Sequence, residues 1–171
     1  MKYMNHLALA GALLSALAMP LPAFAQPKVA RPAVVPLTAS ELTSIYGGRT
    51  WIWNSGGGRF ENTHNQFSAY TREAGKSSVG QGRWAVDENG KLCIFAKWHA
   101  SNGAARAVTC FGHVKVGDTI YQRRYPFGHW YVFRHARVRQ GDEFRKLVAA
   151  DTVTPKVRRW QASVSRNDNR N

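Results

Sequence analysis

Apolar and polar residues alternate over most of the chain between positions 49 and 135, a pattern typical of β-strands that bury one face. The clearest hairpin joins Arg83–Asp87 to Lys91–Ala100 through Asn89-Gly90, a dipeptide that favours the two-residue turns of hairpins. Further strands are expected at Thr50–Asn54, Arg59–Asn62, Asn65–Thr71, Ala105–Val116, Thr119–Arg124 and His129–His135, with Gly75–Val79 ambiguous. Consecutive short strands of this kind predict a mainly β fold, in which an antiparallel meander forms a small barrel or a strongly curved sheet.

A short N-terminal helix is expected before the first strand of this meander. Thr38 can cap the helix, and Glu41 three residues later completes a capping box. Leu42, Ile45 and Tyr46 then fall on one stripe, and two glycines follow where the helix should end. We expect this helix to cap or plug the β core.

The first residues have the features of a cleaved export signal. Lys2 precedes the apolar run Leu7–Met19, and small residues at Ala23 and Ala25 suit signal peptidase, so cleavage is expected just before Gln26. A transmembrane anchor is the alternative, but the apolar run is shorter than the ~20 residues that span a bilayer. The sequence therefore predicts export to the periplasm, with release into the medium as the alternative.

The chain divides into four parts on these patterns. Residues 1–25 are the predicted signal peptide, and the proline-rich residues 26–36 are an expected linker. Residues 37–151 carry the β pattern, and residues 152–171 form a basic, polar tail. After signal cleavage, no remaining segment is long and apolar enough to span a membrane.

The two cysteines, Cys93 and Cys110, lie on adjacent expected strands. If His99 and Ala104 close a four-residue loop, the cysteines face each other directly across the pair of strands. A two-residue Asn102-Gly103 loop would place them diagonally, still on one face of the sheet. In an oxidising compartment such a pair predicts a disulfide, which the loop-entropy model values at about 3 kcal/mol.

The chain is strongly basic, with 24 Lys and Arg against 10 Asp and Glu and a net charge of +14. This balance favours acidic partners such as an acidic glycan or an anionic lipid surface, while export makes nucleic acid the least fitting of them. Arginines interleaved with aromatic rings suit pairing with carboxylate or phosphate groups and stacking on sugars. The candidate residues for an anionic ligand are Arg123, Arg124, Trp130, Arg134, Arg137 and Arg139. The alternative is that the rings fill the core and the arginines form a solvated basic surface.

The sequence nominates no catalytic residue, metal ligand or cofactor. The five histidines that follow the predicted signal peptide lack the short spacing typical of a strand-borne metal pair; they are His64, His99, His113, His129 and His135. No pair of carboxylates stands out for acid–base chemistry, and no GxSxG or SxxK nucleophile motif is present. This favours a non-enzymatic protein, although the sequence alone leaves activity open.

Several segments of the chain resemble one known family in their order and spacing. These segments are LTASELTSIYGGRTWIW, GQGRWAVDENGKLCIFAKWH, VTCFGH, TIYQRRYPFGHWYVFRHA and GDEFRKLV. They are similar to a family of small exported proteins of Gram-negative bacteria that is described only as a domain of unknown function. The resemblance covers roughly Leu37–Asp151 and implies an exported single β domain with a cysteine pair. The family brings no established catalytic residues, so none is carried over.

These observations favour a periplasmic, non-enzymatic module of the cell envelope that binds an acidic component such as a glycan or an anionic lipid. A small-ligand-binding barrel or a hydrolase is one alternative, because a barrel with many rings can enclose a ligand. A secreted factor that acts on a host or partner protein is another. The ligand and the oligomeric state stay open at this level.

Overall fold

The structure is a computed structural model that describes residues 32–168. The predicted signal peptide and residues 26–31 of the expected linker lie outside the described residues. Within residues 32–168, no helix is both long enough and apolar enough to cross a membrane.

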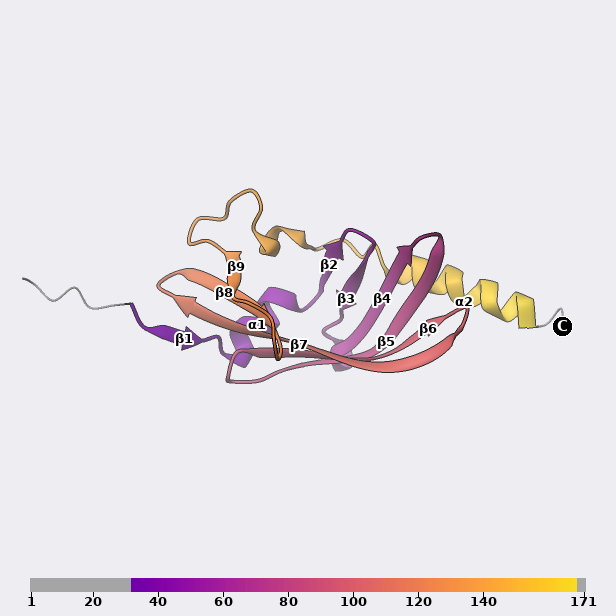
Figure 1. The fold of residues 1–171 in the computed structure, drawn as a ribbon, viewed down its shortest axis with the longest axis horizontal. Helices are drawn as coiled ribbons and strands as arrows, with labels where there is room; N and C mark the ends of the chain where they lie inside the picture. The colour runs from indigo at the N-terminus through magenta and orange to yellow at the C-terminus, as the bar shows by residue number, and fades with distance from the viewer. Residues whose placement is uncertain (1–31, 169–171) are drawn as a thin grey trace, which may run out of the picture. The chain divides into compact units, whose positions relative to one another are not determined.

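Ten antiparallel strands form one sheet, which confirms the prediction of a mainly β, antiparallel fold (Figure 1). The sheet order is β10-β2-β3-β4-β5-β6-β7-β8-β9, and β1 pairs with β7. The sheet curls into a half-barrel, and among the described strands its two end strands, β9 and β10, are not paired with each other. The strands are β1 (Val34–Pro36), β2 (Arg49–Trp53), β3 (Gly56–Phe60), β4 (Gln66–Glu73), β5 (Lys76–Val86), β6 (Lys91–Ala100), β7 (Gly103–Val116), β8 (Thr119–Arg124), β9 (Tyr131–Arg134) and β10 (Leu147–Val148). The helical segments are α1 (Ala39–Tyr46), η1 (Thr63–Asn65), η2 (Glu143–Lys146) and α2 (Thr154–Asp168).

Helix α1 fills one end of the concave face of the sheet. It begins with a capping box, in which Thr38 Oγ1 accepts a hydrogen bond from the Glu41 N–H at 3.2 Å and Glu41 Oε2 accepts one from the Thr38 N–H at 2.8 Å. Leu42 and Tyr46 are fully buried, and the Tyr46 ring lies 5.2 Å from the ring of Phe60 on β3. The last turn of α1 therefore closes this end of the half-barrel with tightly packed side chains.

The 3₁₀ turn η2 connects the two ends of the sheet through side chains. The Phe144 ring contacts the guanidinium group of Arg49 on β2 and that of Arg134 on β9, at 5.7 and 5.5 Å from its centroid. The neighbouring Glu143 Oε1 accepts a hydrogen bond from Trp51 Nε1 at 2.8 Å. Side-chain contacts, rather than a strand pair, therefore hold β9 near β2.

The glycine-rich segments differ from the sequence-based expectation. Gly56–Gly58, which lies between the expected strands Thr50–Asn54 and Arg59–Asn62, begins β3 and pairs with both β2 and β4, so the turn lies at Asn54-Ser55. The ambiguous Gly75–Val79 contributes to β5, which runs without a break through Val86. Glycine occurs within this strand because the neighbouring rings on the concave face leave no space for a side chain. A Cβ atom on Gly58 would lie 2.7 Å from the Phe67 ring.

Both ends of the β domain also contain elements that the sequence pattern does not indicate. Val34–Pro36, assigned to the linker, forms β1 and pairs with Val114–Val116 of β7. The expected polar tail forms α2, and its Val157, together with the preceding Val153, is buried against Val79 of β5. Two valines four residues apart are enough to attach this helix to the sheet, and the polar and basic residues around them conceal the pattern in the sequence.

Candidate functional site

The concave face of the half-barrel contains an apolar trough of about 440 Å³. It lies beyond the end that α1 fills, and aromatic side chains from several strands form most of its walls. The apolar lining residues are Trp51, Trp53, Phe60, Phe67, Ile94, Ala96, Trp98, Ala107 and Phe111. The polar lining residues are Ser55, Thr71, Glu73, Thr109, Arg124 and Glu143. Ligand pockets in proteins have this character, with mainly apolar walls and a few polar groups that set orientation.

Small residues at the centre of the sheet leave this trough open. Ala96 on β6 pairs directly with Ala107 on β7, and both contribute to the lining. On β5, Gly80 pairs with Trp98, and a Cβ atom on Gly80 would lie 2.9 Å from the indole. The indole therefore packs directly against the backbone of Gly80. Successive side chains of a strand point to opposite faces, so the period-two pattern of β6 supplies the trough with every second residue.

A buried polar network forms the boundary between α1 and the sheet. Nδ1 of His113 lies 3.2 Å from the Gly90 carbonyl oxygen, which places the proton on Nδ1 and leaves Nε2 as an acceptor. The Tyr46 hydroxyl lies 2.8 Å from His113 Nε2, and the Gln122 side-chain amide donates to both groups at 2.7 Å. The Tyr131 hydroxyl donates to Gln122 Oε1. Every member of the network has a partner, as buried polar groups require.

The surroundings keep this network uncharged at neutral pH. Burial lowers the pKa of His113 to about 4, against the opposing effect of the Gly90 carbonyl. Burial raises the pKa of Tyr46 well above its ordinary value, and burial together with the nearby Glu143 carboxylate raises the pKa of Tyr131 to about 12. A neutral, fully bonded set of groups stabilises the fold and does not present a poised acid or base.

The charged groups that line the trough differ in whether they already have a hydrogen-bond partner within the described residues. Glu73 Oε1 accepts a hydrogen bond from Ser55 Oγ at 2.8 Å. Glu143 accepts hydrogen bonds from Trp51 Nε1 at 2.8 Å and from Lys146 Nζ at 2.7 Å. The exposed Arg124 side chain makes no hydrogen bond or ion pair with residues of the described part of the chain. Arg124 is therefore the charged lining group best placed to pair with a ligand.

The six residues expected to bind an anion do not form one site. Arg124 lines the trough, whereas its neighbour Arg123 points to the opposite face of β8, because adjacent strand residues alternate. The Arg123 guanidinium lies 4.8 Å from the ring centroid of Trp130 and 4.5 Å from that of Tyr125, so these two predicted residues do meet. Arg134 instead contacts Phe144 at the join between β9 and β2. The remaining two, in the exposed segment after β9, are Arg137 and Arg139.

Asp142 fixes the segment that carries these two arginines. Its carboxylate accepts hydrogen bonds from the backbone N–H groups of His135 and Arg139, at 3.1 and 2.9 Å, and from His135 Nδ1 at 2.6 Å. Burial alone would raise the pKa of Asp142, but these hydrogen bonds lower it to about 2. Asp142 therefore stays ionised and holds the two ends of the loop together.

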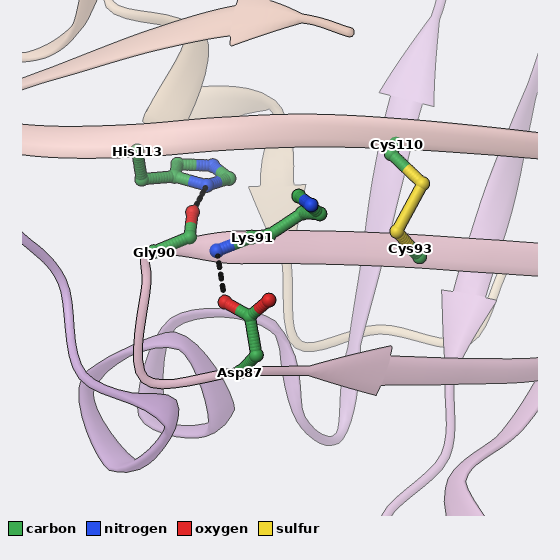
Figure 2. The surroundings of a disulfide bond; sticks show 6 residues. All are labelled: Asp87, Gly90, Lys91, Cys93, Cys110 and His113. Carbon is green, nitrogen blue, oxygen red and sulfur yellow. Dashed lines mark hydrogen bonds between the residues drawn. A yellow bond between two sulfur atoms is a disulfide. The ribbon is translucent and has the colours of Figure 1, made fainter.

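The cysteine pair lies on the opposite face of the sheet from the trough. Cys93 on β6 faces Cys110 on β7 directly, the two are joined by a disulfide, and their Cα atoms are 4.1 Å apart (Figure 2). The pairing Ala100↔Gly103 closes the hairpin around Ser101-Asn102, one residue pair further than the His99–Ala104 loop considered from the sequence. Both loops give the same register, so the directly opposed arrangement is confirmed.

Groups that could hold a metal ion or form a catalytic pair are sparse among the described residues. Within residues 32–168, no group of three His, Cys, Asp or Glu side chains could hold a metal ion. The one histidine–carboxylate contact in this part of the chain is His135 with Asp142, and no Ser, Thr or Cys side chain bonds to either imidazole nitrogen. The geometry therefore nominates no nucleophile–base pair.

Fold and trough together define a small, mainly β protein with an antiparallel half-barrel and an apolar hollow on its concave side. Residues 14–153 match the family described as "Protein of unknown function (DUF995)". This match covers well over half of the chain, which belongs to that family, and the family resemblance noted from the sequence is confirmed. No curated protein and no solved structure matches the chain significantly.

Proposed function

We propose that this protein is an exported, non-enzymatic module of the cell envelope that binds an anionic amphiphile, a molecule with an apolar body and an acidic head group, in the trough. The observation that carries the proposal is the apolar hollow of about 440 Å³ with Arg124 on its lining. Its volume lies within the range of about 300–1,000 Å³ typical of small-molecule sites. An anionic lipid is the envelope component that matches both halves of this description.

The apolar walls of the trough suit the apolar body of the ligand, and its charged group suits the acidic head group. Removing an apolar chain from water is favourable by about 25 cal/mol per Å² of apolar surface, and Trp53, Trp98 and Phe111 supply rings for that burial. Arg124 suits the head group, since a guanidinium pairs with carboxylate or phosphate through two parallel hydrogen bonds. The two carboxylates of the lining are already engaged by Ser55, Trp51 and Lys146. The net charge of +14 favours the approach of an anion to the molecule as a whole.

Export of the chain rests on the N-terminal sequence pattern and on the cysteine pair. A disulfide persists in an oxidising compartment, and the periplasm is one. Mass spectrometry of the protein isolated from its native cells checks this part of the proposal. The expected product begins at Gln26 and contains the Cys93–Cys110 disulfide, and a product that begins at Met1 with two free thiols would contradict it.

The binding proposal is tested with the chain from Gln26 onward and a fluorescent long-chain fatty acid as the probe. We expect saturable binding by the native protein. Ala107→Trp places an indole at the exposed edge of the hollow and should abolish binding, because Ala107 is exposed and the ring can be added without straining the core. Val108→Trp is the matched control, since Val108 is 62% exposed and points to the opposite face of β7. Equal binding by both variants, or no binding by the native protein, would reject the trough as the site.

A further inference from the structure

A second hollow lies between α2 and strands β2, β3 and β4, and it shares Trp53 and Ser55 with the lining of the trough. Its volume is about 870 Å³. Its lining includes Tyr70, Arg72, Ser77, Lys156, Arg159 and Trp160. We call this hollow the helix groove.

Helix α2 presents one polar, basic stripe to the helix groove. Lys156, Arg159 and Ser163 are spaced three and four residues apart, which places them on one side of the helix. The adjacent stripe anchors the helix, because Val157 is buried against the sheet and Gln161 Nε2 donates a hydrogen bond to Gln81 Oε1 on β5 at 3.0 Å. The two cations are therefore carried by a helix with a fixed position on the sheet.

Strand β4 forms the opposite wall of the groove. Tyr70 and Arg72 are two residues apart and so project from the same face of β4. The Tyr70 hydroxyl is hydrogen-bonded to Ser77 Oγ at 2.9 Å, which fixes the ring, and the Lys156 ammonium lies 5.6 Å from the ring centroid. Trp160 of α2 provides a second, partly exposed ring.

The charge of the helix groove has a single sign. Arg72, Lys156 and Arg159 line it, and its described lining contains no carboxylate. The side chains of these three residues make no hydrogen bond or ion pair with the rest of residues 32–168. Like charges placed together without counter-charges repel one another, so an anion bound among them is favoured.

From this combination we propose that the helix groove binds a short acidic saccharide. Cations pair with its carboxylate or phosphate groups, and aromatic rings offer flat apolar surfaces against which a sugar ring can stack. The hydroxyl and amide groups of Asn54, Ser77 and Ser163 suit the many hydroxyls of a sugar. An anionic lipid bilayer fits less well, because the rings are set within a groove and do not project from the surface. This inference does not depend on the trough or on its ligand.

The experiment measures binding of an oligogalacturonate by isothermal titration at low and at high salt. Lys156→Gln with Arg159→Gln removes two charges from the groove, and we expect affinity to fall about tenfold or more at low salt. The matched control is Arg158→Gln with Arg166→Gln, which removes two charges from exposed positions of the same helix that do not line the groove. The control should change affinity by no more than about twofold, in keeping with the weak effect of distant, screened charges. Circular dichroism of both double variants confirms that α2 and the sheet are retained.

Three further probes separate the saccharide from other anions. A neutral oligosaccharide of the same length should bind much more weakly, and inorganic phosphate should not compete at equimolar concentration. Vesicles of anionic phospholipid should not respond to the groove variants. Equal weakening by the two double variants would show that net charge alone is responsible and would overturn the proposal. Failure of oligogalacturonate to bind, or equal response to phosphate or vesicles, would overturn it as well.

Discussion

The Tyr46 hydroxyl lies 2.8 Å from Nε2 of His113 inside the half-barrel, and this contact ties the end of α1 to β7. Gln122 of β8 donates to both groups, so α1 meets the hairpin of β7 and β8, which is distant from it in sequence, at one point. His113 is only 1% exposed, and the backbone carbonyl of Gly90 orients its ring (Figure 2). The consequence is a fold whose interior depends on one imidazole remaining neutral.

Stability should therefore decrease on mild acidification. His113 titrates near its ordinary value of 6.5 when unfolded and at about 4 when folded, so the folded state binds the proton less well. The contribution of this difference to the free energy of unfolding is fully present above pH 6.5. It is lost as pH falls from 6.5 through about 4, for a total of about 3 kcal/mol. Urea unfolding at a series of pH values measures this slope.

Two variants assign this slope to one residue. His113→Phe removes the titrating group and should flatten the profile between pH 6.5 and 4. His129→Gln replaces an exposed histidine and should keep the native slope. Asp142 affects stability in a separate pH range. Its pKa is lowered from 3.8 to about 2, so its contribution to the free energy of unfolding is lost only as pH falls below 3.8. A native protein equally stable at pH 6.5 and 4.5 would contradict the role assigned to His113.

Two neighbouring arginines on β8 provide a test of whether the charged group in the trough pairs with the acidic head group of the ligand. Arg124→Gln should weaken binding of the fluorescent fatty acid about tenfold or more, because a charge-assisted hydrogen bond is typically worth about 1.5–3 kcal/mol. Arg123→Gln has the same effect on net charge, but Arg123 contacts Trp130 and Tyr125 on the other face of the strand. It should leave affinity nearly unchanged. The corresponding fatty alcohol, which lacks the acidic group, should respond to neither variant, and similar losses from both arginines would argue against a specific head-group contact.

The disulfide should contribute to stability without defining the fold. Cys93→Ala with Cys110→Ala is expected to lower the free energy of unfolding by about 3 kcal/mol, the loop-entropy value for the 17-residue separation. The antiparallel ladder between β6 and β7 extends from Lys91 to Gly112, so the far-UV spectrum should be retained. Native protein with reductant should match the double variant, and loss of strand structure in either sample would show that the disulfide is required for folding.

The parts of the fold that follow from local rules could be predicted from the sequence. The alternation that places Trp51 and Trp53 on one face was visible, and both line the trough. The observed register of Cys93 and Cys110 is one of the two that the sequence allows for the intervening turn. Both candidate loops place the two cysteines on one face of the sheet, and the structure has the directly opposed arrangement.

The two candidate sites depend on contacts that the sequence does not display. Grouping Arg123 with Arg124 ignored the alternation of strand residues, which sends the two guanidinium groups to opposite faces. The hollow of the trough depends on Ala96 meeting Ala107 in register, and the helix groove depends on α2 packing beside β4. Lys156 and Arg159 were assigned to a polar tail, since two buried valines gave too weak a pattern to indicate a packed helix.

The way η2 joins β9 to β2 has a mechanical consequence. In a closed barrel, widening the interior requires backbone hydrogen bonds between strands to break. Here the join consists of the Phe144 ring with two guanidinium groups and the Trp51–Glu143 hydrogen bond, and both residues of that bond also line the trough. If the trough binds a ligand as proposed, a wider ligand would require side chains at this join to rotate and would leave the backbone hydrogen bonds of the sheet intact.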